Sequence, residues 1–179
     1  MKKLTLRLDT KSIKKIKDEI EKYQLSLQVK SEELVNRLLD EGIKVAYQHV
    51  PSRYSGYIEF TKEVTGEGTQ CIGMLIGKNA QTFISRWVTK AGTQEAEVNS
   101  LLMAEFGSGW LANVIWNVSG VGQGTFPGQT HATDQLWFWV DEDGIKHHSR
   151  GEPPTYPMYH ADMQMLAKID SIAKEIFSE

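Results

Sequence analysis

The stretch TKSIKKIKDEIEKYQLSLQVKSEELVNRLLDEGIKVAYQHVP, residues 10–51, contains a single Gly and no Pro before its last position. Its apolar residues recur every three or four positions, which is the period of one helix face. The pattern predicts two nearly continuous helices, the first capped by Thr10 or Ser12 and the second begun at Ser31. Pro51 ends this helical arm, because proline has no backbone N–H to donate. The apolar stripe consists of Ile13, Ile16, Ile20, Tyr23, Leu27, Leu34, Val35, Leu38, Leu39, Ile43 and Ala46.

On both sides of this stretch the pattern indicates strands and further helices. Alternating or continuously apolar segments between turn residues are typical of strands, and a period of three to four residues indicates a helix. Six Gly fall within residues 107–128, which predicts a long loop of a kind that usually has a function. The expected elements are strands at 3–9, 56–64, 69–77 and 82–89, a short helix within 95–110, a Gly-rich loop at 107–132, an aromatic hairpin at 136–149 and a terminal helix at 158–179.

Together these elements predict an α+β fold. Residues 1–50 form an N-terminal strand and helical arm, and residues 51–179 form an α+β domain that makes a single globular unit with them. The domain holds an antiparallel β-sheet with a long Gly-rich loop and a hairpin, and the C-terminal helix packs on the sheet. A chain of 179 residues with 40% hydrophobic content is large enough for one core.

Composition excludes several functional classes. The net charge is −3, divided into +3 on residues 1–50 and −6 on the remainder, so the whole chain is not drawn to nucleic acid or to membranes. No apolar run reaches the roughly 18 residues of a membrane span, and no apolar segment follows Lys2 and Lys3 as in a signal peptide. The single Cys71 excludes an intrachain disulfide and a Cys-based zinc site.

WFWVDEDGIKHHS, residues 137–149, is the first candidate for a metal site, because acids and His lie close together. An EF-hand loop that started at Asp141 would need Gly at its sixth position, but Gly144 comes at the fourth and Lys146 stands at the sixth. His147 and His148 are neighbours on a predicted strand, so they point to opposite faces and cannot easily bind one zinc ion. Asp141 with His147 could still form half of a site. We expect a hairpin whose aromatic side chains fill a core.

Other motifs carry little chemistry. GVGQGTFPGQTH lacks the helix that must follow a dinucleotide-binding loop, since Pro127 comes at once. Cys71 lies in an apolar run and is expected to be a small buried hydrophobic residue. In AEFGSG, Glu105 is the acid to test for catalysis, but we expect it to accept backbone hydrogen bonds in a structural turn with Gly107 and Gly109. The sequence therefore predicts no catalytic, cofactor-binding or metal-binding residue.

The N-terminus offers an alternative function in DNA binding. Lys3, Thr5 and Arg7 would line one face of a strand that precedes two helices, which is the order of a ribbon-helix-helix module. The predicted turn between the two helices lacks the Gly that such modules usually carry, and about two-thirds of the chain would have no role in the module. A ribbon-helix-helix-like DNA-binding protein remains the second hypothesis.

Four short motifs follow one another in an order that is informative as a whole. They are MAEFGSGW (103–110), VGQGTFPGQTHA (121–132), LWFWVDEDGIKHHSRG (136–151) and PTYPMYHADMQM (154–165). In this order the chain resembles the tail-component, or head–tail joining, proteins of long-tailed phages and prophages. The likeness extends over nearly the whole chain and is strongest from residue 103 onward.

The resemblance implies a structural virion protein of the phage neck or tail, with no reaction and no cofactor. Such proteins are expected to form a homo-oligomer, a hexameric ring around the DNA channel, between the tail terminator or tail-tube protein and the head–tail connector. Genomic DNA would pass through the lumen without sequence-specific binding, and no membrane is involved. The protein would be found in the virion and, during assembly, in the host cytoplasm. Aromatic residues are enriched at interface centres, so the predicted interface residues are Trp110, Trp116, Phe126, Trp137 and Trp139.

Overall fold

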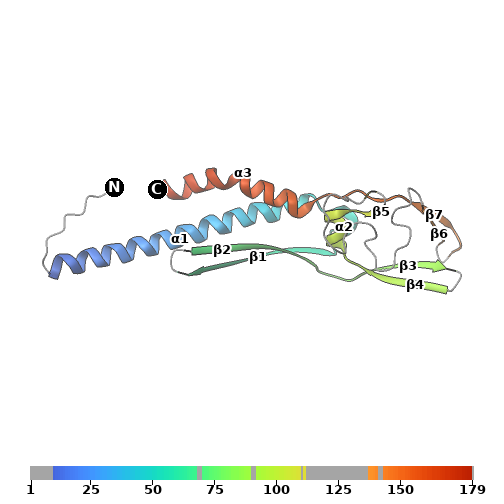
Figure 1. Ribbon diagram of the computed structural model, residues 1–179, viewed down its shortest axis with the longest axis horizontal. Coiled ribbons are helices and arrows are strands. Elements are labelled where there is room, and N and C mark those ends of the chain that lie inside the picture. The colour runs from blue at the N-terminus through green and yellow to red at the C-terminus, as the bar shows by residue number, and fades with distance from the viewer. Residues whose placement is uncertain are drawn as a thin grey trace.

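The computed structural model describes residues 10–67, 70–89, 92–109, 111, 137–140 and 143–178. The molecule is elongated, with two helices and a long hairpin at one end and a small sheet at the other (Figure 1). The elements are α1 (Thr10–Gln48), η1 (Ser52–Tyr54), β1 (Ile58–Glu67), β2 (Gln70–Asn79), β3 (Phe83–Thr89), β4 (Gly92–Val98), α2 (Ser100–Phe106), β5 (Ser108–Gly109), β6 (Trp137–Val140), β7 (Lys146–Ser149), β8 (Gly151–Glu152) and α3 (Pro157–Phe177).

Helix α1 is one unbroken helix of 39 residues, because neither Gly nor Pro occurs before its last two turns. Helix α3 runs antiparallel to the C-terminal half of α1 (Figure 1). His160 stacks on His49 near the start of α3, and Glu175 pairs with Arg37 near its end. The strand expected at residues 3–9 lies outside the described residues.

Strands β1 and β2 form an antiparallel hairpin along α1, in register from Ile58 opposite Asn79 to Glu67 opposite Gln70. The predicted α+β class is confirmed, with the N-terminal and C-terminal helices packed on this sheet. The core lies where the helices, the hairpin and α2 meet. Its buried members are Ala46, Tyr54, Ile58, Phe60, Met103, Ala104 and Ala161.

Gly73 on β2 lets the hairpin approach α1 closely. A methyl group there would overlap Cγ1 of Val35 and lie 2.9 Å from Cδ1 of Leu39. Because Val has a stiff side chain, Gly73→Ala is expected to lower the free energy of unfolding by about 1–2 kcal/mol. Urea denaturation measures the effect. Gly56→Ala is the control, since nothing lies within 4 Å of its added methyl group, and an equal loss in both variants would contradict the explanation.

The second sheet has four strands in the order β4-β3-β6-β7. The aromatic hairpin is confirmed, because β6 pairs antiparallel with β7. The predicted helix within 95–110 is wrong at its start, because residues 92–98 form β4 and pair with β3. The side chain of Asn99 then accepts the N–H of Leu102 at 3.0 Å and caps α2. This cap fixes the start of α2 at Ser100.

Candidate functional site

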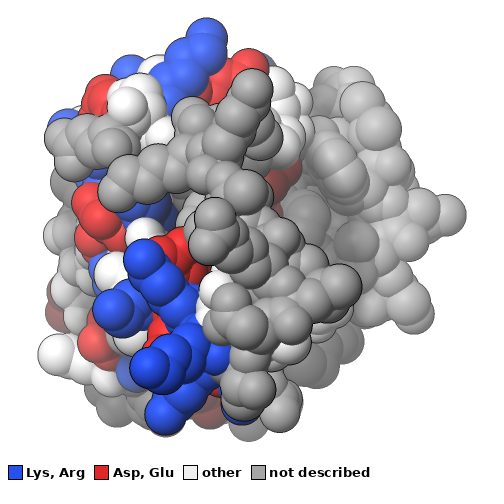
Figure 2. Space-filling model, turned by 90° about the vertical axis from the view of Figure 1, so that its left-hand side faces the viewer, with Lys and Arg blue, Asp and Glu red and all other residues white. Residues whose placement is uncertain are grey.

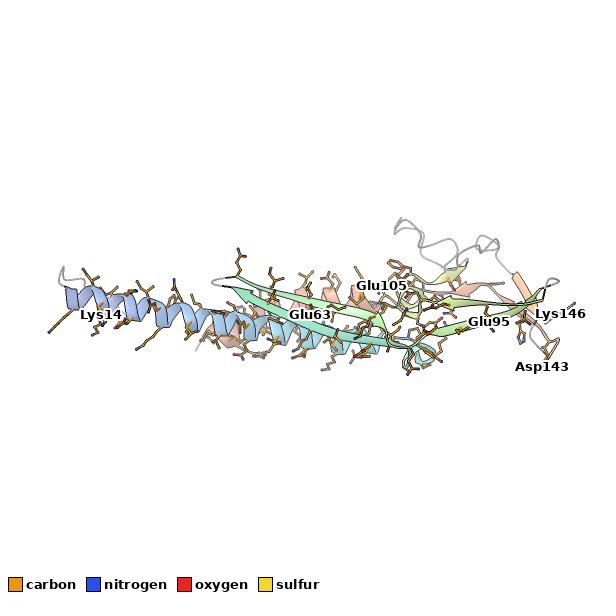
Figure 3. The ribbon with its side chains drawn as sticks, turned by 90° about the horizontal axis from the view of Figure 1, so that it is seen from below. Lys14, Glu63, Glu95, Glu105, Asp143 and Lys146 are labelled. Carbon is orange, nitrogen blue, oxygen red and sulfur yellow. The ribbon has the colours of Figure 1, made fainter. Side chains whose placement is uncertain are left out.

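Helix α2, which carries Glu105 (labelled in Figure 3), ends against the beginning of α3. Glu105 accepts the N–H of Met158 at 2.8 Å through Oε2 and that of Tyr159 at 3.1 Å through Oε1. Both are first-turn groups of α3, which have no partner inside their own helix. The N-cap residue Tyr156 has φ 53° and makes no side-chain capping hydrogen bond. Glu105 therefore caps α3, rather than its own turn.

A second set of hydrogen bonds joins the same two helices. The carbonyl of Ala104 accepts the N–H of Thr155 at 2.8 Å and that of Tyr156 at 3.2 Å. It also accepts the hydroxyl of Thr155 at 3.1 Å. The segment that leads into α3 is thus held by the last turn of α2.

Gly107 ends α2 with φ +74° and donates its N–H to the carbonyl of Met103 at 2.9 Å. A Cβ at this position would overlap the carbonyl oxygen of Glu152 and lie 2.9 Å from N and Cδ of Pro154. Both the dihedral angle and the lack of space therefore require Gly. The next residues form β5, where Gly109 pairs with Gly151 in β8. We call this meeting of α2, β5, β8 and the start of α3 the junction.

Tyr54 fixes β8 from the other side of the junction. Its side chain is buried, and its hydroxyl donates to Oε2 of Glu152 at 2.7 Å. Arg53 forms an ion pair with Glu152 and lies over the Tyr54 ring, 4.7 Å from its centroid. Burial and the bond to Glu152 raise the pKa of Tyr54, so the hydroxyl stays a hydrogen-bond donor at neutral pH.

The electrostatics of the junction centre on Glu105 and a pair of His. Burial raises the pKa of Glu105, while the N–H groups of Met158 and Tyr159 and the nearby His160 oppose this shift. The ring of His160 stacks on His49 with centroids 3.8 Å apart. Both oxygens of Glu105 are engaged by backbone donors, an arrangement that suits holding a helix rather than transferring a proton.

The stacked His pair predicts sensitivity to acid. Burial, together with His160, lowers the pKa of His49 below 6.5, so the unfolded chain binds protons more readily than the folded one. The contribution of neutral His49 to the stability of the fold is fully present above pH 6.5. It is lost as the pH falls through this value toward the pKa of His49 in the folded state. We expect His49→Gln to flatten the fall in melting temperature between about pH 7 and about pH 5, measured by circular dichroism. His148→Gln, an exposed position on β7, should leave that fall unchanged; equal flattening would contradict the assignment.

The residues that the sequence singled out fall into three groups in the structure. Trp137 and Trp139 lie in β6, opposite Ser149 and His147 respectively. Glu105, Gly107 and Gly109 are brought together at the end of α2. The predicted interface residues Trp110, Trp116 and Phe126, and nearly all of the Gly-rich loop, lie outside the described residues, as does Asp141.

Several residues that hold the junction together were not predicted from the sequence. One cluster consists of buried Tyr54, Glu152 and the exposed Arg53. A second contact is the stacking of His49, just after α1, on His160 in α3. The only local signal was the pair Pro154 and Pro157, which flanks the start of α3.

Within the described part of the chain, no group of three or more His, Cys, Asp or Glu side chains could hold a metal ion. Among the described helices, none is both long and apolar enough to cross a membrane. Comparison of the chain with known protein families, with curated proteins and with solved structures found no match.

Proposed function

We propose that this chain is a structural subunit of the neck of a long-tailed phage, where it joins the tail tube to the capsid connector as a ring around the DNA channel. The observation that supports the proposal is the contact between two of the motifs that carry the resemblance. Residues 103–110 and 154–165 lie far apart in the chain, yet Glu105 caps the helix that the second motif begins. The carboxyl group of Glu105 and the first-turn N–H groups of α3 are thus used to build the fold.

This use of Glu105 favours a structural role over an enzymatic one. A general acid or base must reach the proton that it transfers, at about 2.6–3.2 Å. Here the carboxylate accepts two N–H groups of α3 instead. No cofactor is needed for an assembly role.

The shape and the charge also suit a ring. A closed ring requires two different patches on each subunit, and an elongated molecule separates such patches well (Figure 1). Residues 51–179 carry a net charge of −6, which disfavours binding to DNA phosphates in a channel. The proposed partners are further copies, the tail terminator or tail-tube protein, and the connector.

The alternative function in DNA binding has less support than the neck function. A ribbon-helix-helix module needs a turn between two helices, and α1 is continuous through residues 10–48. The strand that would carry Lys3 and Arg7 lies outside the described residues. A gel shift at low salt that is lost in Lys3→Ala/Arg7→Ala would revive this alternative, and no shift with the wild type would end it.

Analysis of purified phage particles tests the proposed location. Mass spectrometry should find the chain in tailed particles, and gold-labelled antibody should mark the point where tail meets capsid. Its absence from particles, or label only along the tail shaft, would contradict the proposal. Particles made without the chain should show free heads and free tails.

A further inference from the structure

Residues 10–30 of α1, which we call the arm, project beyond the hairpin and beyond the end of α3 (Figure 1). The tip of the hairpin reaches Glu32, whose Oε1 would lie 2.9 Å from a Cβ at Gly66. At 1.5 Å per residue the arm is roughly 30 Å long. An isolated helix of this length is marginal in water, so the arm needs a partner to be stable.

The arm carries an apolar stripe that no other described element covers. Ile13, Ile20 and Tyr23 are 52%, 48% and 65% exposed, whereas Leu39 further along α1 is buried. With Ile16 and Leu27 the stripe repeats at spacings of three and four residues, which is the pattern of a helix that packs against another helix.

An apolar groove lies on the body of the molecule. It has a volume of about 200 Å³ between α1, α3 and β2, which is room for several aliphatic groups. Leu166 on one wall is 59% exposed. The groove is lined by Val35, Leu38, Gly73, Met165, Leu166 and Ile169.

The charges of the arm and of the groove walls are complementary. The arm has six Lys, no Arg and three acids, a net charge of +3. Basic side chains gather on the face at the end of the molecule from which the arm projects (Figure 2). Among the described residues, Asp162 is the one charged residue in the lining of the groove. Of the elements that form it, residues 31–48 of α1 carry −2, α3 carries −1 and β2 carries +1. Two arms would repel each other, whereas an arm and a groove attract.

The arm cannot fill the groove of its own chain. Both belong to α1, a single helix, so they stay separated by the length of helix between them. The occupant of the groove must come from another chain, and a second copy offers both the apolar stripe and the opposite charge.

We propose that the arm of one copy lies in the groove of the next copy, in a head-to-tail contact. The inference deepens the proposed function and rests on it for the head-to-tail direction, which a ring requires. Arm and groove are then the two different patches of one repeating interface.

Sedimentation velocity of the full chain tests the contact. The wild type should associate as its concentration rises, and Ile20→Asp in the arm or Leu166→Asp in the groove should weaken association by at least about tenfold. Matched controls are Leu25→Asp, which is 63% exposed on the opposite side of the arm, and Met163→Asp, which is 48% exposed on α3 outside the groove. Both controls should associate like the wild type. Circular dichroism checks that every variant keeps its helices.

Mixing the two variants gives a second readout. Ile20→Asp keeps an intact groove and Leu166→Asp keeps an intact arm, so the mixture should form one-to-one complexes that do not grow. A mixture that stays monomeric, a wild type that stays monomeric at about 100 µM, or an Ile20→Asp variant that associates normally would overturn the inference.

A disulfide provides direct proof of the contact. In a Cys71→Ser background, Ile20→Cys with Leu166→Cys cannot form an intrachain bond. Leu166 lines the groove with Val35 and Leu38, which lie more than about 20 Å along α1 from Ile20, and a disulfide needs Cα atoms within about 7 Å. Oxidation should give a ladder of linked chains, and none with Leu25→Cys in place of Ile20→Cys.

If neck rings form from Ile20→Asp subunits, the arm inference fails while the neck function stands. If the arm contact forms but the chain is absent from particles, the function fails.

Discussion

Gly107→Ala is expected to lower the free energy of unfolding by about 3 kcal/mol, the largest effect of any substitution considered. The residue has φ +74° and ψ −169°, a region that essentially only Gly adopts and that costs another residue about 1–3 kcal/mol. The added methyl group would also overlap the carbonyl oxygen of Glu152 and press on the ring of Pro154. Both obstacles are backbone or proline atoms, so the junction must open to relieve the overlap. Urea denaturation with a two-state fit gives the value.

Gly144→Ala is the matched control for this prediction. Its φ of +79° is similar, but nothing lies within 4 Å of an added Cβ. It therefore carries only the dihedral strain and should cost about 1 kcal/mol. Equal losses in the two variants would show that the close approach to β8 contributes nothing.

Glu105→Ala is expected to cost about 2 kcal/mol, because the N–H groups of Met158 and Tyr159 lose their acceptor at the start of α3. Burial of the carboxylate offsets part of this contribution, as its raised pKa indicates. The raised folded pKa means that the contribution of Glu105 is largest below 4.5 and declines as the pH rises through the folded value. The destabilisation by Glu105→Ala should therefore be smaller at pH 7 than near pH 4.5.

Glu63→Ala is the control for the cap, since Glu63 is exposed on β1 (Figure 3). It should change stability by less than about 0.5 kcal/mol. Amide hydrogen exchange adds a local readout, because only Glu105→Ala should accelerate exchange at the start of α3. Unchanged protection there would contradict the capping role.

Much of the fold could be predicted because long periodic segments leave few choices. The pattern of residues 10–48 predicted two nearly continuous helices, and the structure joins them into one helix without a break at Ser31. The terminal helix begins at Pro157, one residue before the expected start. Strand β4 was missed because Ala96 and Val98 fit either a helix or a strand over such a short run. Pairing with β3 decides between them, and no local pattern contains that information.

The candidate site was predictable in kind but not in its contacts. Local chemistry marked Glu105 as a backbone acceptor, yet its donors lie 53 and 54 residues away. The arm is uncovered because α1 is longer than the helix that packs on it. The 39 residues of α1 span about 58 Å, whereas the 21 residues of α3 span about 32 Å. The apolar stripe alone predicts burial and does not show which part lacks a partner.

Negative-stain imaging of the chain, mixed with the connector and tail-tube proteins of the same phage, tests most directly whether it is a ring-forming neck subunit. Class averages should show closed rings with a central channel when the partners are present. Arm variants such as Ile20→Asp should fail to close, and Leu25→Asp should close normally. A wild-type chain that never forms rings, with or without these partners, would contradict the proposed function.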